Sequence, residues 1–150
     1  MKKQDKIIKI DYYLRTNKTS FIWNQIEAES DFYYQLILQT DIGTLTLHLN
    51  VEDTPYTLIT CTSNLEWDDS LLPNYYKKAN EWMLISDILR VIIDIEAKRI
   101  VFSYTYTAQE DFFDPASLLA MADSLVQKVL ETCLPAFLEL KKMKTEDIIN

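Results

Sequence analysis

Residues 71–107 read LLPNYYKKANEWMLISDILRVIIDIEAKRIVFSYTYT and carry the densest apolar and aromatic pattern of the chain. Pro73 suits the first turn of a helix, and two β-rich runs follow at 90–95 and 99–107. The helix is expected to bury one stripe, made of Leu72, Tyr75, Tyr76, Ala79 and Met83. The stretch therefore predicts a helix that leads into a β-hairpin, with the rest of the chain as its cover.

The hydrophobic pattern also predicts how the two β-rich runs pair. A two-residue loop at 97–98 places every apolar pair on one face, whereas a shift by one residue would put Asp94 in the core. The expected partners are Glu96 with Arg99, Ile95 with Ile100, Ile93 with Phe102 and Val91 with Tyr104. An ion pair between Glu96 and Arg99 should close this hairpin.

A second hairpin is predicted upstream, where strands at 31–40 and 44–51 join at a turn that contains Gly43. Glycine suits a positive φ at this turn. The inward positions are Phe32, Tyr34, Leu36, Leu38, Leu45, Leu47, Leu49 and Val51. Around this hairpin, residues 20–29 are β-rich but mixed, 56–62 predict a short strand and 64–70 predict an acidic loop.

The chain begins with an ambiguous segment, because residues 5–15 fit a helix and a strand equally well. The family resemblance described below favours a short helix. Towards the other end, Asp114 and Pro115 suit the N-cap and first turn of a helix that runs to about residue 140. Pro135 is expected to kink this helix or to end its regular part.

The buried stripe of the C-terminal helix is predicted to contain Leu118, Ala122, Leu125, Val129 and Cys133. Three lysines, Lys141, Lys142 and Lys144, lie where positive charge suits the helix dipole, and the last residues, TEDIIN, are expected to fray. Cys61 and Cys133 each lie in an apolar pattern, so both are expected to be buried free thiols.

These elements predict a single α+β domain over residues 1–150. Its antiparallel sheet has flanking helices in the order α-β-β-β(-β)-α-β-β-α. A chain of 150 residues is long enough to bury one core.

A net charge of −8 argues against a surface for nucleic acid or for an anionic membrane, because such a surface needs clustered Lys and Arg. The charge suits a basic protein partner. The sequence contains no pattern typical of a signal peptide or a membrane span, so a cytoplasmic location is expected. Gly43 is the only glycine, which excludes the glycine-rich loops that hold nucleotide phosphates. No cofactor is expected.

Catalytic and metal-binding patterns are also missing from the sequence. His48 is the only histidine. It lies on the outward side of its predicted strand, and no Ser, Cys or carboxylate stands at a spacing from it that would indicate a catalytic or metal site. The sequence has no Cys or His cluster of the kind that binds zinc. The carboxylate pairs at 68–69 and 110–111 fit solvated loops better than an acid–base pair, which needs two different environments. The chain is therefore expected to have no catalytic, cofactor-binding or metal-binding residues, and not to be an enzyme.

Tyr33 and Ile37 lie on the second face of the strand at 31–40, whose first face is already apolar. A strand that is apolar on both faces is either covered on both sides or presents a binding surface. Cover by a helix or a dimer partner and an open ligand groove all fit this pattern. Tyr33, Ile37 and Trp23 are therefore the candidate partner-binding residues.

The segments NYYKKANEWM, RVIIDI, RIVFSYTYT and DPASLLAMADSLVQKVL give an order of elements similar to the fold shared by type III secretion chaperones and the YbjN-like family. Asn80 matches an asparagine near the end of that family's helix. The chain departs from the pattern before residue 30, where DKIIKIDYYL is a less clear first helix. The resemblance implies a non-enzymatic homodimer that holds a polypeptide client or partner protein on apolar surface.

Two further functions stay open on the sequence. A small-molecule-binding domain or an unrecognised enzyme would need a deep aromatic cavity in which Tyr, Asp and Glu side chains converge. A structural subunit that serves a larger partner protein would have the same sequence features as the chaperone-like module. Fold alone does not decide among these functions.

Overall fold

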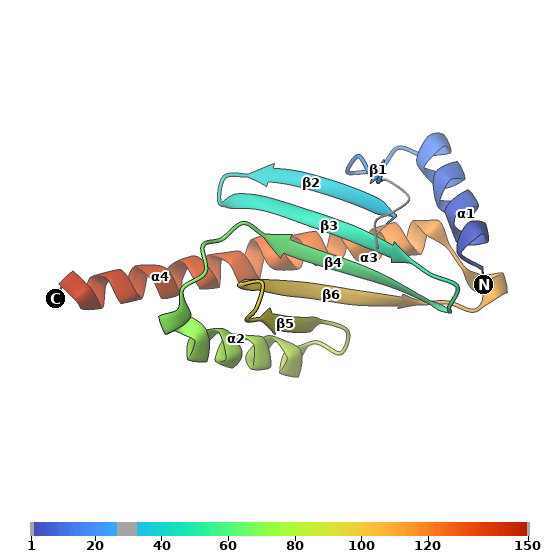
Figure 1. Ribbon diagram of the computed structural model, residues 1–150. Helices are drawn as coiled ribbons and strands as arrows, with labels where there is room; N and C mark the ends of the chain where they lie inside the picture. The colour runs from blue at the N-terminus through green and yellow to red at the C-terminus, as the bar shows by residue number, and fades with distance from the viewer. Residues whose placement is uncertain (1, 27–32, 150) are drawn as a thin grey trace.

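The computed structural model describes residues 2–26 and 33–149 and contains a six-stranded antiparallel sheet flanked by helices (Figure 1). Its helices are α1 (Lys3–Thr16), α2 (Leu72–Ile85), α3 (Pro115–Lys128) and α4 (Leu134–Ile149), with a π-helical turn at Val129–Cys133 and 3-10 turns at Asp69–Leu71 and Glu110–Phe112. Its strands are β1 (Asn24–Gln25), β2 (Tyr34–Thr40), β3 (Gly43–Val51), β4 (Tyr56–Ser63), β5 (Arg90–Asp94) and β6 (Arg99–Thr107). The strand order is β1-β2-β3-β4-β6-β5, so the predicted α+β class and order of elements are confirmed.

One face of the sheet forms the core. The buried residues of this face alternate along the strands and include Tyr34, Leu36, Leu45, Leu47, Leu49, Ile59, Cys61, Phe102 and Tyr104. Helices α3 and α4 cross behind the sheet in Figure 1, and α2 lies beside β5. The ring of Phe137 on α4 lies 5.5 Å from Tyr75, 5.2 Å from Trp82 and 6.2 Å from Phe102 between centroids. This aromatic cluster joins α2, α4 and the sheet.

The upstream hairpin forms as predicted. In the β2–β3 ladder Leu36 lies opposite Leu47, and Gly43 has a φ of 146°. Phe32 lies outside the described residues. In the described part of the mixed segment, residues 20–26, the two residues of β1 pair with β2.

The predicted register of the second hairpin is wrong by two residues. Asp94 pairs with Arg99 and Val91 with Phe102, so residues 95–98 form a four-residue loop. The favoured two-residue loops need positive φ at both residues (type I′) or at the first (type II′), whereas of residues 97 and 98 only the second, Lys98, has positive φ, at 54°. Asp94 stabilises the longer loop, because its carboxylate accepts a hydrogen bond from the Ala97 amide at 3.0 Å.

A shift of two residues keeps every side chain on its predicted face, so Asp94 stays out of the core. The loop itself differs from the prediction: Ile95 is exposed, and the ion pair to Arg99 comes from Asp94 at 3.6 Å instead of from Glu96.

The buried stripe of α2 differs from the predicted one. Tyr75, Ala79 and Trp82 are buried, whereas Tyr76 is exposed. The spacing of four and then three residues keeps the buried three on one side of the helix, and Tyr76 lies about 100° away from Tyr75 around the helix axis.

The C-terminal helix starts as predicted. Asp114 accepts a hydrogen bond from the Ala116 amide at 3.1 Å, and Pro115 occupies the first turn. The predicted stripe from Leu118 to Cys133 is buried.

Pro135 does not end this helix. Instead, the Leu134 amide bonds to the Val129 carbonyl, five residues back. Such a wider turn relieves the clash of a proline ring with the carbonyl four residues earlier. The helix then continues to Ile149, beyond the predicted end near residue 140, so the prediction that the last residues fray is wrong for 145–149.

The ambiguous N-terminal segment is helical, with Ile7 and Ile10 buried. Lys6 is also fully covered by protein. Its ammonium donates to the Tyr56 carbonyl at 2.8 Å and lies 5.9 Å from the centroid of the Phe113 ring. Burial lowers the pKa of Lys6 below its ordinary value of 10.5, against the opposing effect of Glu52 and Asp53.

Cys61 and Cys133 are free and buried, as predicted, and burial raises the pKa of each thiol to about 12. No helix among residues 2–26 and 33–149 has the length and hydrophobicity needed to cross a membrane.

We expect stability to rise with pH through Lys6. The unfolded chain keeps the proton of Lys6 up to about pH 10.5, whereas the folded chain releases it at lower pH. The unfolded state therefore binds more protons in this window, and the free energy of unfolding increases as pH rises. Urea denaturation of wild type and Lys6→Met between about pH 7 and pH 10.5 measures the effect, because the tyrosines and cysteines are common to both proteins and their titration cancels in the difference.

The stability of wild type relative to Lys6→Met should grow across that range. Lys9→Met is the matched control, because Lys9 is an exposed lysine of the same helix. A constant difference for Lys6→Met, or the same trend in both variants, would contradict the assignment.

Candidate functional site

The second face of the sheet is the candidate site, and we call it the open face. None of the described helices covers it: in Figure 1, α3 and α4 both lie on the opposite side of the strands. The open face is made of Gln35, Ile37, Gln39, Thr44, Thr46, His48, Asn50, Leu58, Thr60, Thr62, Val101, Ser103, Thr105, Arg90 and Ile92. Because successive side chains of a strand alternate between faces, burial of the core residues directs these residues outward.

Two rows of side chains run across the open face. The first is uncharged and consists of Ile37, Thr46, Thr62, Val101 and Ile92. The two isoleucines at its ends are 57% and 54% exposed. The second row consists of Gln35, His48, Thr60, Ser103 and Arg90. Short β-branched and hydroxyl side chains in the middle of both rows leave a surface without large protruding groups, on which an extended chain can lie flat.

His48 has a structural contact on this face. Its Nε2 lies 3.0 Å from the Gln35 side-chain amide. Burial lowers the pKa of His48, and the positive charge of Arg99 lowers it further, so the ring is neutral at pH 7. In the described part of the chain, no group of three His, Cys, Asp or Glu residues is placed to hold a metal ion.

The three partner-binding residues predicted from the sequence do not form one surface. Ile37 lies on the open face. Tyr33 is half-buried, with the Lys3 ammonium 5.6 Å from its ring centroid and the Tyr34 ring packed edge-on at 5.0 Å. Trp23 is buried beside α1 and α3. Of the three, Ile37 is therefore the residue available to a partner.

Sequence reasoning missed an exposed apolar group next to β5. Leu84 and Ile85, at the end of α2, are 85% and 74% exposed, and Ile88, in the link to β5, is also exposed. A signal was available, because Leu84 and Ile85 fall outside the stripe set by Tyr75 and Ala79.

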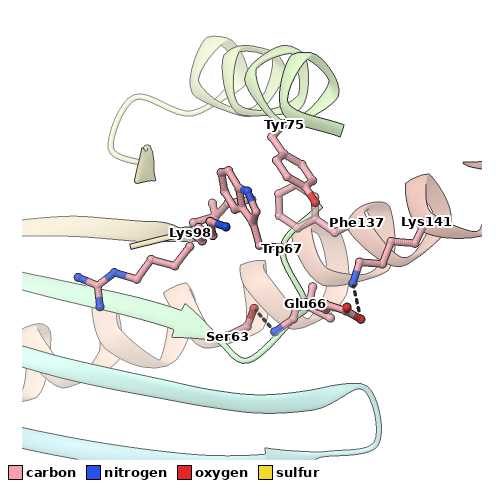
Figure 2. A pocket seen from close by; sticks show the side chains of 10 residues that line it. Ser63, Glu66, Trp67, Tyr75, Lys98, Phe137 and Lys141 are labelled. Atoms are coloured by element: carbon pink, nitrogen blue, oxygen red, sulfur yellow. Dashed lines mark hydrogen bonds and ion pairs between the residues drawn. The ribbon is translucent and has the colours of Figure 1, made fainter. Parts of the chain in front are cut away.

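An aromatic cavity lies where the β4–α2 connection meets α4 (Figure 2). Trp67, Tyr75 and Phe137 point toward one another, and Lys141 forms an ion pair of 4.0 Å with Glu66 at the rim. The cavity volume is about 30 Å³, enough for one or two water molecules. A pocket for a typical organic ligand is roughly ten times larger. This cavity gives no support to a small-molecule site.

The same connection is fastened to α4 by Asp68. Its carboxylate forms an ion pair of 2.6 Å with Lys144, which also bonds the Ser70 hydroxyl. The hydrogen bond from Lys144, followed by those from Ser70, holds the pKa of Asp68 at about 2. Lys141 and Lys144 therefore bind the acidic loop, whereas the sequence had suggested that they stabilise a helix end.

Comparison with known proteins adds no assignment: no protein-family model, no curated protein and no solved structure matches this chain.

We expect the carboxyl of Asp68 to titrate near pH 2 in the wild type and closer to 3.8 in Lys144→Met. The variant removes the main hydrogen bond to the ionised carboxylate. Carbon-detected NMR of the side-chain carboxyl measures the midpoint directly. Lys141→Met is the control, because Lys141 contacts Glu66 and should leave Asp68 unchanged. An unchanged midpoint in Lys144→Met would refute the pairing.

Proposed function

We propose that this chain is a non-enzymatic protein-binding module, of a chaperone-like or regulatory kind, that acts as a homodimer and holds polypeptide at its sheet. The observation that carries the proposal is the open face, which no described helix covers. Ile37 and Ile92, each more than half exposed at the ends of the uncharged row, add apolar surface on which another protein can pack.

The chemistry of the open face suits an extended polypeptide. The first row of the open face, from Ile37 to Ile92, carries no charge. An apolar or neutral segment can therefore lie on it without burying an unpaired ion. The hydroxyls of Thr46, Thr60 and Thr62 can donate to and accept from backbone groups of such a segment. The overall charge of −8 favours clients with basic flanks, because it attracts them from a distance.

The order of elements agrees with this proposal. Four strands precede α2, two follow it and a long helix closes the domain. We propose on this ground that the chain belongs with the YbjN-like and type III secretion chaperone-like folds, in which apolar surface holds a protein partner.

Binding to the open face can be tested with extended peptides selected by display against the purified protein. Backbone amide shifts on peptide addition should change along β2, β3, β4 and β6. Thr46→Lys places a charge in the middle of the uncharged row and should weaken the affinity about tenfold or more.

The matched control is Gln127→Lys, which introduces the same side chain at an exposed position of α3 and should bind as the wild type does. Circular dichroism establishes that both variants fold. Equal affinity for the wild type and Thr46→Lys, or shift changes confined to α2 and α4, would overturn the proposal.

A further inference from the structure

We propose that the cleft between α1 and the strands β1 and β2 binds a free amino acid with an apolar side chain (Figure 1). The cleft is lined by Asp11, Leu14, Arg15, Trp23, Gln25 and Tyr34. Its volume is about 440 Å³, within the range of sites for small organic ligands, compared with about 30 Å³ for the aromatic cavity near Phe137. None of the lining residues belongs to the open face, so the inference goes beyond the proposed function.

The Asp11 carboxylate is fixed in position at one wall of the cleft. It accepts hydrogen bonds from the Tyr34 hydroxyl and from the Gln25 side-chain amide, which lies 2.8 Å from Oδ1 and 2.9 Å from Oδ2. Burial and the contact with Asp11 raise the pKa of Tyr34 above its ordinary value, so the phenol stays a donor. Among the described residues Oδ2 accepts from Gln25 alone. Because a carboxylate oxygen has two acceptor positions, Oδ2 can also accept from an ammonium group.

The opposite charge is supplied by Arg15, one turn further along α1. A separation of four residues corresponds to about 6 Å along the helix axis. Within residues 2–26 and 33–149, the side chain of Arg15 makes one hydrogen bond, from Nε to the Asp11 carbonyl at 3.4 Å. The two terminal nitrogens of the exposed guanidinium are therefore available, and their planar fork suits a carboxylate.

This pair of charges selects the class of ligand. A free amino acid presents an ammonium group to Asp11 and a carboxylate to Arg15 at the same time. Its side chain would lie on the half-buried Leu14 and the largely buried ring of Trp23, which favour an apolar group. The N-terminus of a peptide carries only the ammonium, and the C-terminus carries only the carboxylate. Neither would satisfy both walls of the cleft.

Backbone amide shifts in NMR titrations test this site with leucine as the probe. Leucine should bind saturably with a dissociation constant of about 1 mM or tighter, and the shift changes should centre on residues 11–15 and 23–25. Leucinamide, which lacks the carboxylate, and N-acetylleucine, which lacks the ammonium, should each bind about tenfold more weakly or worse, because each loses one charged contact.

Arg15→Gln tests the carboxylate contact without touching the groups that hold Asp11. The variant should weaken leucine binding about tenfold or more, whereas it should not weaken leucinamide binding. Lys9→Gln is the matched control, because Lys9 is an exposed cation of the same helix that does not line the cleft. Circular dichroism establishes that both variants fold.

Four outcomes would overturn the inference. They are the absence of a saturable shift with leucine, shift changes confined to other parts of the chain, equal affinity for leucine and either analogue, and equal leucine affinity for the wild type and Arg15→Gln. Peptide binding to the open face is measured separately with Thr46→Lys, so either proposal can fail while the other stands.

Discussion

Burial of one apolar sheet face under the C-terminal helix is the constraint on which the rest of the structure depends. Strands β3, β4 and β6 present alternate residues to α3, the π-helical turn and α4, and these residues are almost completely removed from water. The wider turn before Pro135 keeps the helix continuous across the sheet, so that Phe137 reaches the aromatic rings of α2. The four described helices bury their side chains in the core on this face, and none of them covers the opposite face.

The uncovered face is therefore a consequence of how the helices are arranged. A sheet with helices on both faces would bury the row that contains Thr46 and Thr62, and its strands would be apolar on both sides. Here that row is uncharged and only partly exposed between two isoleucines.

Strict alternation made most of the fold predictable, because a strand with period two admits one assignment of faces. The β2–β3 hairpin, the inward faces of its strands and the cap at Asp114 follow from local chemistry in this way. The loop at 95–98 does not, since a shift of two residues preserves every face. The choice between the registers depends on the backbone angles of the loop and on the hydrogen bond from Ala97 to Asp94. Trp23 lies in a segment whose apolar residues fall on both faces of a strand, so the sequence does not say whether it is buried. Its burial depends on α1 and α3, which are distant in the sequence. The burial of Trp82 in place of Tyr76 likewise depends on how the aromatic cluster around Phe137 turns α2.

Thiol reactivity measures the difference between the two faces most directly. Cys61 and its neighbour Thr60 are adjacent in β4 but point to opposite faces, Cys61 into the core and Thr60 into the middle of the open face. In native Thr60→Cys protein, a maleimide should modify the introduced thiol rapidly and leave Cys61 and Cys133 unmodified, because both are buried and their pKa is about 12. Slow modification of the introduced thiol together with rapid modification of Cys61 in the folded protein would contradict the division into a covered and an open face.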